Sequence, residues 1–443
     1  MRHKFYTRFT LPLFIAFGFQ SCVVVQNTYS KIAPGTWRAV LHFFPSAVTP
    51  NKKGQPLPEK MNLKMEDFTE GDLPFTLDIN YKNENQVEVV FHNAEEEIKI
   101  GSEDILIGHD KKTGLDTIRI NFAIYNTYIK AIYRERVMEG EWVSPAKKIS
   151  IPFEAHQGQN YRFTQLAKAP IANLTGNFET TFNDSDSTNY KAVGEFKQNG
   201  NALTGTFRTE TGDYRYLQGE VQADKLYLSC FDGTHLFLFE GKIQKDKTIN
   251  GIFRSGRNTP EIFNAKFNPN AALANGNALT KAISTSNPIN FTFKDADGKT
   301  VSLDQFGDKV KIIQIMGTWC PNCRDETNFL KDFVAKNENK DVSVIALAFE
   351  RNPEIATQQV KIYKEKMQVP YPILIAGTST NKDSTSKKLP FLDKFIGYPT
   401  LIHLDKKNRI RNIHTGFDGP ATSKFADYKK EFNILTEKLL FEK

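Results

Sequence analysis

Two cysteines in the last third of the chain have a spacing that suits redox chemistry. Cys320 and Cys323 lie within GTWCPNCRDE, at 317–326. If a helix begins at Pro321, Cys320 is its N-cap residue, and the unpaired N–H groups of the first turn favour a thiolate there. Cys323 then lies one turn later on the same face, within reach of a mixed disulfide formed at Cys320. We interpret the pair as a nucleophile and a resolving thiol.

Glu326 follows a further turn along the same helix face. A carboxyl group partly buried beneath the sulfurs can accept or donate the proton that one of them exchanges. The alternative is an acid near the helix start that only complements the helix dipole. We predict the proton-handling role, because the phase of Glu326 matches that of both cysteines.

The stretch GYPTLIHL, at 397–404, supplies a second part of such a site. A cis bond before Pro399 would present the backbone of Tyr398 to an incoming peptide, and Pro399 has no N–H to compete. The alternative is an ordinary trans-proline at the end of a loop. Because Pro399 directly precedes a strand-like run, we predict the cis form and a substrate-binding edge.

The elements that must position these residues alternate between strand and helix. VKIIQIM, at 310–316, is an apolar run typical of a strand buried on both faces. Strands are also predicted at 341–350 and 371–377, helices at 324–337, 352–367 and 424–441, and a hairpin at 400–416. This order predicts a thioredoxin-like α/β domain over residues 289–443.

The chain before this domain is predicted to be all-β. Apolar residues alternate at 75–81, 86–92 and 116–133, and Gly-x-aromatic units recur between 171 and 268. We therefore predict two β-rich parts, 22–165 and 166–268, built as an antiparallel sandwich or barrel. Cys230 lies within a predicted strand and is interpreted as a buried core residue. Residues 269–288 are rich in Asn, Ala, Ser and Thr and are predicted to be a linker.

The first residues have the layout of a secretion signal. A basic start precedes an apolar run, Leu11–Phe19, which is too short to span a bilayer and ends in Gln20-Ser21-Cys22. This ending resembles a bacterial lipoprotein signal. We predict a signal peptide at 1–21, lipidation of Cys22 and a protein anchored to a membrane in an oxidising compartment. An ordinary signal with a chance cysteine is the alternative.

Composition argues against several other classes of protein. The 443-residue chain has a formal net charge of +7 without a run of Lys and Arg, so no nucleic-acid partner is expected. Its four cysteines are too few for a disulfide-stapled fold. Cys320 and Cys323 supply only half of a zinc site, and the scattered histidines add no ligand spacing, so no metal is predicted. A structural disulfide in so tight a loop would add little stability. Residues 316–318 lack the pattern expected of a peroxiredoxin.

Together these motifs resemble the TlpA/ResA branch of thioredoxin-like thiol–disulfide oxidoreductases. The residues that match the family pattern are Trp319, Cys320, Cys323, Glu326, Pro399 and Thr400. The β-rich front half resembles lipoproteins of the Bacteroidetes type. The sequence QIMGTWC departs from the aromatic-rich run that is usual in the family, and Pro-Asn lies between the cysteines.

The resemblance implies a membrane-anchored oxidoreductase that faces the periplasm and uses no cofactor except its own Cys320–Cys323 disulfide. Reduction of client disulfides is the expected direction, with electrons from a membrane thiol-reducing transporter and clients such as apocytochrome c. The residues implied to contact or shape access for the substrate are Trp319, Pro321, Tyr398, Pro399 and Thr400. The alternative is a ligand- or partner-binding β region whose thioredoxin-like part is a thiol oxidase or a non-catalytic passenger.

Overall fold

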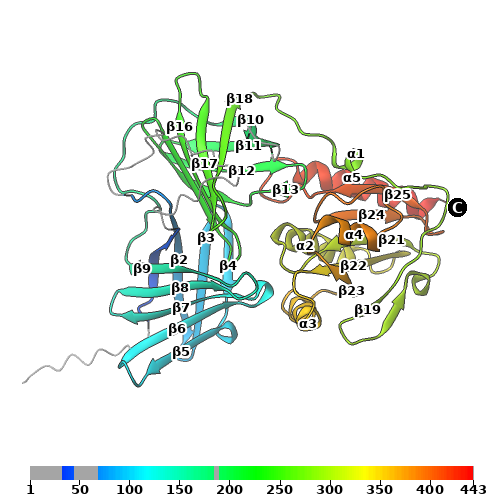
Figure 1. The fold of residues 1–443 in the computed structure, drawn as a ribbon, viewed down its shortest axis with the longest axis horizontal. Coiled ribbons are helices and arrows are strands. Elements are labelled where there is room, and N and C mark those ends of the chain that lie inside the picture. Colours follow the sequence, from blue (N-terminus) through cyan, green and yellow to red (C-terminus); the bar gives the residue numbers. More distant parts are fainter. Residues whose placement is uncertain (1–31, 44–67, 184–188, 443) are drawn as a thin grey trace, which may run out of the picture. The chain divides into compact units, whose positions relative to one another are not determined.

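The computed structural model describes residues 32–43, 68–183 and 189–442 (Figure 1). The predicted signal peptide and Cys22 lie outside the described residues. Residues 33–443 form one compact unit, and the described strands form three sheets of nine, nine and seven strands. Among the described residues, no helix combines the length and apolar character that crossing a bilayer requires.

The first sheet is open and antiparallel, with the order β4-β3-β2-β1-β9-β8-β7-β6-β5. Its strands are β1 Gly35–His42, β2 Asp72–Asn83, β3 Gln86–Asn93, β4 Glu96–Ile100, β5 Ile105–Asp110, β6 Leu115–Phe122, β7 Thr127–Arg134, β8 Val137–Ser144 and β9 Ile149–Gln157. Two 3-10 turns connect strands that are consecutive in the chain. η1 Ser102–Asp104 connects β4 and β5, which lie at opposite ends of the sheet, and η2 Ala123–Tyr125 connects the paired strands β6 and β7. Residues along β7 alternate between buried and exposed, because successive side chains of a strand point to opposite faces.

The alternating run at 116–133 forms two strands. It divides into β6 and β7, which pair with each other and are joined by η2. Asn126 adopts a left-handed conformation, with φ of 53°, and ends this turn. Asn tolerates that conformation better than most residues, which explains the break within an otherwise regular pattern.

The second sheet closes on itself as an antiparallel barrel. Its order is β11-β10-β18-β17-β16-β15-β14-β12-β13, and an additional β11–β12 pairing completes the circle. Its strands are β10 Gly176–Phe182, β11 Tyr190–Asn199, β12 Ala202–Thr209, β13 Gly212–Asp213, β14 Leu217–Gln222, β15 Lys225–Phe231, β16 Leu236–Ile243, β17 Ile249–Ser255 and β18 Glu261–Phe267. The predicted all-β character and the barrel form of this part are therefore confirmed.

Aromatic side chains fill the barrel. Phe207 and Phe239 stack with their ring centroids 4.7 Å apart, and Phe239 and Phe253 stack at 4.5 Å. Cys230 is fully buried in the same cluster, as predicted for a core residue. A two-residue turn at Gly200 and Asn201 joins β11 and β12, and Gly200 has a φ of 59° that favours glycine. The abundance of phenylalanine in the sequence thus serves in part to fill this barrel.

The two β sheets meet around the β15–β16 turn. The Phe231 ring stacks on Phe75 of the first sheet at a centroid distance of 4.3 Å. The Gly233 carbonyl accepts hydrogen bonds from the side chains of Thr127 (2.5 Å) and Trp142 (3.0 Å). Apolar stacking and paired polar groups therefore join the first sheet to the barrel.

The third sheet has the order β20-β19-β23-β22-β21-β24-β25. Its strands are β19 Thr292–Asp295, β20 Thr300–Ser302, β21 Val310–Met316, β22 Val342–Glu350, β23 Ile373–Thr378, β24 Thr400–Leu404 and β25 Ile410–Thr415. β21, β22 and β23 run parallel, whereas β24 is antiparallel to β21. This mixed sheet, with helices in its crossovers, confirms the predicted thioredoxin-like fold.

The helices are α1 Gly276–Leu279, α2 Pro321–Lys336, α3 Ala356–Lys366, α4 Lys382–Lys388 and α5 Phe425–Phe441, with a 3-10 turn, η3, at Leu303–Phe306 (Figure 1). The predicted start of α3 at 352 is wrong by several residues. Asn352 instead caps a preceding turn, with its Oδ1 accepting the Glu354 N–H at 3.0 Å.

Both faces of β21 are covered. Ile312 and Met316 pack in a cluster with side chains of α2, α3 and α5, whereas Ile313 and Ile315 pack in a second cluster on the opposite face. Successive side chains of a strand point to opposite faces, so Gln314 shares the face of Ile312 and Met316. This register places one polar side chain beneath α2.

The segment between the barrel and the third sheet is held by specific contacts. It contains the short helix α1. The Thr280 and Thr415 hydroxyls lie 2.7 Å apart in a buried hydrogen bond, and Ala282 forms a bridge with Leu392. The domain boundaries derived from the sequence stay predictions.

Candidate functional site

Cys320 and Cys323 lie at the beginning of α2 and are joined in a disulfide. Cys320 is the N-cap residue, and its Sγ accepts a hydrogen bond from the Cys323 N–H at 3.2 Å. Pro321 occupies the first turn, where it lacks only an N–H that the helix does not use. Cys320 is 6% exposed and Cys323 is 0% exposed, so the Cys320 sulfur is the one that a substrate can reach.

Glu326 is completely buried on the same helix. Its Oε2 accepts a hydrogen bond from Gln314 Nε2 at 3.0 Å, and its Oε1 accepts one from the Tyr428 hydroxyl at 3.3 Å. Burial raises the pKa of Glu326 to about 8, although both hydrogen bonds act in the opposite direction. Because this carboxyl lies beyond the first turn and is buried, its environment suits proton transfer better than the dipole role considered as the alternative.

Gln314 connects this carboxyl to the resolving cysteine. Its Nε2 also donates to the backbone carbonyl of Cys323 at 3.2 Å. Its Oε1 accepts hydrogen bonds from Thr327 (3.3 Å) and Tyr371 (3.4 Å), so both ends of the buried amide are satisfied. The sequence analysis missed this residue, although a single amide within an apolar strand was a visible signal.

The bond between Tyr398 and Pro399 is cis, as predicted. The Tyr398 hydroxyl shares a hydrogen bond with Thr385 Oγ1 at 2.7 Å, and burial raises its pKa to about 12. Thr400 is buried, and its hydroxyl donates to the Gly397 carbonyl at 2.8 Å. Thr400 therefore supports this loop from within.

Trp319 lies between the cysteines and this loop. Its ring contacts Tyr398 edge to face, with centroids 5.3 Å apart, and its Nε1 donates to the Phe349 carbonyl at 3.0 Å. The Arg351 guanidinium lies 3.9 Å from the centre of the Trp319 ring, a distance that allows a cation–π contact. The indole is thus fixed on two sides, and no pattern in the sequence pointed to Arg351.

The barrel also reaches the cysteine helix. Asn322 Nδ2 donates to the backbone carbonyl of Asp213 at 3.2 Å. Arg215 is completely buried and forms an ion pair with Asp325 of α2. These contacts join positions more than a hundred residues apart, and the sequence analysis did not find them because no local pattern marks them.

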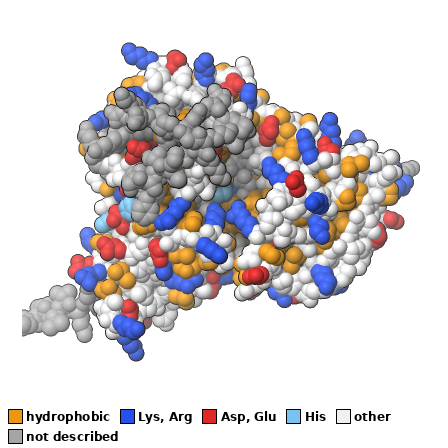
Figure 2. Space-filling model, viewed as in Figure 1, with side chains coloured by type: hydrophobic (Ala, Val, Ile, Leu, Met, Phe, Trp, Pro, Cys, Tyr) orange, Lys and Arg blue, Asp and Glu red, His pale blue; other side chains and the backbone are white. Residues whose placement is uncertain are grey.

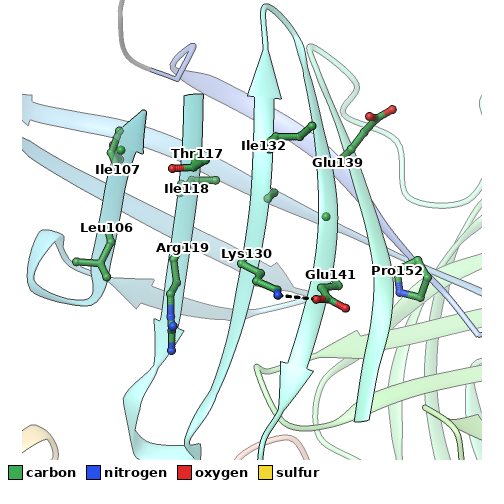
Figure 3. A pocket seen from close by; sticks show the side chains of 13 residues that line it. Leu106, Ile107, Thr117, Ile118, Arg119, Lys130, Ile132, Glu139, Glu141 and Pro152 are labelled. Carbon is green, nitrogen blue, oxygen red and sulfur yellow. Dashed lines mark ion pairs between the residues drawn. The ribbon is translucent and has the colours of Figure 1, made fainter. Parts of the chain in front are cut away.

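A cavity lies on the outward face of the first sheet (Figure 3). It has a volume of about 690 Å³ and is lined by residues of strands β5 to β9, among them the exposed Leu106 and Ile132. Two of its charged residues, Lys130 and Glu141, pair with each other at 2.7 Å. Under the alternative in which the β region binds a ligand, this is a place where one could lie.

Charges of both signs are intermixed with apolar side chains on the face drawn in Figure 2. Within the described residues, no group of three or more His, Cys, Asp or Glu side chains has an arrangement that could hold a metal ion. His403 is buried, which lowers its pKa to about 3, and its Nε2 lies 3.3 Å from the Thr436 hydroxyl. Its surroundings fit a structural role.

The family match to known proteins lies in the C-terminal part of the chain. Residues 283–431 match the family described as Redoxin. The thioredoxin-like protein YneN of Bacillus subtilis is 28% identical over 126 residues, which cover 28% of this chain and 68% of YneN. The thiol-disulfide oxidoreductase ResA of Bacillus thuringiensis subsp. konkukian is 31% identical over 80 residues, which cover 18% of this chain and 46% of that ResA.

A solved structure, a thiol:disulfide interchange protein of the thioredoxin family from Chlorobium tepidum, is also similar. It has 19% identity and a TM-score of 0.28, and the match covers 36% of this chain and 99% of that one.

The redoxin match and the strand order of the third sheet identify residues 283–431 as a redoxin domain with a thioredoxin-like fold, and a disulfide lies at the beginning of its helix α2. The resemblance drawn from the cysteine motif is thereby confirmed for this part of the chain.

Proposed function

We propose that this protein is an envelope-anchored thiol–disulfide oxidoreductase that reduces disulfides of client proteins. The observation that carries the proposal is the arrangement of Cys320 at the start of α2, with the buried Glu326 on the same helix and a cis-proline in the neighbouring loop. The names of the relatives support the reaction class. The direction of electron flow, the anchor and the clients are the parts that experiment must test.

The reaction begins with attack by the Cys320 thiolate on a sulfur of the client disulfide. The client S–S bond breaks, one client sulfur leaves as a thiolate, and the other forms a mixed disulfide with Cys320. Cys323 then attacks Cys320 Sγ, which closes the protein disulfide and releases the second client sulfur. Two electrons pass from the protein dithiol to the client, and a dithiol donor must restore the reduced protein.

Glu326 serves the second step. The Cys323 thiol must lose its proton before it can attack, and a nearby carboxylate can accept that proton. In the disulfide form, the raised pKa of about 8 keeps the carboxyl group protonated at neutral pH. When a donor reopens the disulfide, the same proton can return to the Cys323 sulfur.

Insulin reduction tests the reaction. The wild-type chain, with dithiothreitol as the donor, should precipitate the insulin B chain faster than dithiothreitol alone. Cys320→Ser should abolish the difference, whereas Cys230→Ser should keep it, because Cys230 is enclosed in the barrel core. Unchanged reduction by Cys320→Ser would reject the enzyme proposal and favour the passenger alternative.

The redox potential of the Cys320–Cys323 couple tests the direction. A value near that of thioredoxin, about −270 mV, supports a reductase, whereas one near −120 mV, as in a strong oxidant, would reverse the assignment. Equilibration with glutathione or dithiothreitol buffers, read by alkylation of Cys320, gives this number.

The anchor and the partners complete the proposal. We propose that Cys22 carries the lipid and that the protein faces the periplasm. A membrane thiol-reducing transporter would supply electrons, and clients would include apocytochrome c. Metabolic labelling with a radioactive fatty acid should mark the wild type and not Cys22→Ala. Release of the variant into the soluble fraction would show that the anchor is attached at Cys22. Equal labelling of both proteins would contradict it.

A further inference from the structure

Cys320 lines a cavity with two unlike walls. The cavity has a volume of about 800 Å³. One wall comes from the thioredoxin-like domain and includes residues 319–322 and Tyr398, and the other comes from the barrel and includes residues 209–214. Both walls belong to the compact unit of residues 33–443.

The barrel wall is fixed against the redox site. Besides its carbonyl contact with Asn322, Asp213 accepts the Gly419 N–H on Oδ2 at 3.2 Å. The Thr211 side chain lies so close to Gly397 that a Cβ there would be 2.9 Å from Thr211 Cγ2. A cavity of this size encloses a ligand of a few residues, so the wall restricts access to short segments.

Charges around the cavity are unequal. The acidic side chains that line it are Glu210 and Asp213, and the cationic ones are Lys147, Lys191, Arg351 and Lys382. Asp213 is buried, and its carboxylate is occupied by the backbone N–H groups of Arg215 (2.7 Å) and Gly419. The lining therefore carries an excess of positive charge close to the reactive sulfur.

Most of these cations form no ion pair with a described residue. Lys191 has one, a weak contact of 3.8 Å with Glu179. No carboxylate of the described residues forms an ion pair with Lys147, Arg351 or Lys382. An incoming carboxylate would gain attraction from them, whereas an incoming cation would be repelled.

We propose that the preferred substrate is a disulfide in a short extended peptide segment that carries carboxylate side chains beside its cysteines. This inference rests on the proposed function and adds a substrate class to it. The acidic side chains lie toward the cations of the cavity, while the segment passes between the barrel wall and the Tyr398–Pro399 loop. Sulfur exchange then proceeds as described above, with a dithiol as the final electron donor.

Three peptides of equal length, each with one intrachain disulfide, test the inference on the full chain. The residues that flank the cysteines are Glu in the first, Gln in the second and Lys in the third, and dithiothreitol regenerates the enzyme. We expect kcat/KM to fall in that order, by about tenfold from Glu to Lys at low salt, with the difference shrinking as ionic strength rises.

The outcomes separate the inference from the proposed function. Equal rates, a preference for the Lys peptide, or reduction of insulin without reduction of any of the peptides would overturn the inference and leave the oxidoreductase intact. Failure with insulin and with every peptide would instead overturn the proposed function.

Variants locate the effect. Lys147 and Lys382 have exposed side chains, so the double variant Lys147→Gln/Lys382→Gln should fold, which its Tm verifies. It should lower the Glu-to-Lys ratio of kcat/KM by about threefold or more. Lys148→Gln is the matched control, because Lys148 is exposed beside Lys147 but does not line the cavity. An unchanged ratio in the double variant would contradict the assignment.

Discussion

Asn322, between the two cysteines, donates a hydrogen bond from its side chain to the backbone of Asp213 in the barrel, at 3.2 Å. Gly212 precedes Asp213 and has a φ of 145°, and a Cβ built on it would lie 2.1 Å from Asn322 Nδ2. The approach of the barrel to the cysteine loop thus depends on the absence of a side chain at Gly212.

Gly212→Ala should therefore disturb the cysteine loop as well as the barrel. We expect a loss of about 1–3 kcal/mol in the free energy of unfolding and faster iodoacetamide labelling of reduced Cys320. Gly200→Ala is the control, because Gly200 also has a positive φ but has nothing within 4 Å of an added Cβ. If both variants label Cys320 at the same rate, the contact with Asn322 does not shield the sulfur.

The buried carboxyl of Glu326 should give the oxidised protein a characteristic pH dependence. Folding raises its pKa from 4.5 to about 8, so the folded state holds a proton that the unfolded state has lost. The contribution of Glu326 to the free energy of unfolding is therefore greatest below its unfolded-state pKa. It falls as the pH rises toward its folded-state pKa, by something on the order of 3–5 kcal/mol.

Glu326→Gln should remove this pH dependence. As the pH increases from 5 to 8.5, the free energy of unfolding should therefore fall in the wild type and fall less in the variant. Urea unfolding at several pH values, with the disulfide intact, measures it. Glu338→Gln, at an exposed position just after α2, should follow the wild-type profile. Parallel profiles for wild type and Glu326→Gln would contradict the raised pKa.

Arg215 is the centre of a buried ion cluster that joins the β sheets to α2. It pairs with Glu96 at 2.5 Å, lies 3.6 Å from Asp232 and contacts Asp325. Arg215→Met leaves these acids without their counter-charge, so we expect a loss of about 3–5 kcal/mol in the free energy of unfolding. Arg136→Met, at an exposed site, should change it by less than about 0.5 kcal/mol. Denaturant titration gives both values, and a loss below 1 kcal/mol for Arg215→Met would refute the role of the cluster.

The two active-site cysteines should behave differently when one is removed. In Cys323→Ser, the mixed disulfide with Cys320 cannot be resolved, so the complex with a client should accumulate and be visible on a non-reducing gel. Cys320→Ser should trap much less, because Cys323 is 0% exposed. Stronger trapping by Cys320→Ser would reverse the assignment of attacking and resolving sulfurs.

Cys230 should be unreactive in the folded protein. It is completely buried, and burial raises the pKa of its thiol well above the usual range. After reduction at pH 7, mass spectrometry should find Cys320 alkylated first and Cys230 alkylated only after denaturant is added. Rapid labelling of Cys230 without denaturant would show that the barrel opens readily.

The part of the site that lies on one helix could be predicted from the sequence. Cys320, Cys323 and Glu326 follow at intervals of three, and the helical repeat alone places them on one face. Pro321 and the cis bond before Pro399 were also predictable, because proline restricts the backbone so strongly. The helical repeat and the backbone restriction of proline were sufficient to predict these residues.

The partners of these residues could not be predicted, because they come from distant parts of the chain. Gln314 and Tyr428 meet Glu326 only when β21 and α5 pack against α2. Residues 209–215 reach the cysteines through the barrel, and Arg351 reaches Trp319 from the end of β22. Such contacts depend on tertiary packing, for which period-two or helical patterns carry no information.

The same limit applies to the β sheets. Alternation identified which side chains of a strand face inward, but it does not state which strands are neighbours. The pairing of β11 with β12 that closes the barrel passes through a two-residue turn at Gly200 and Asn201, and the break at Asn126 was hidden within continuous alternation.

The first sheet stays open, and its terminal strands have consequences for self-association. β4 carries Glu97 and Lys99, a charged pair 3.1 Å apart that discourages strand addition by a second molecule. β5, at the other end of the sheet, exposes Leu106 and Ile107, and among the described residues no strand pairs with its outer edge. In concentrated solution, we expect copies to join through β5 into dimers or longer aggregates, and we expect Leu106→Lys to keep them apart.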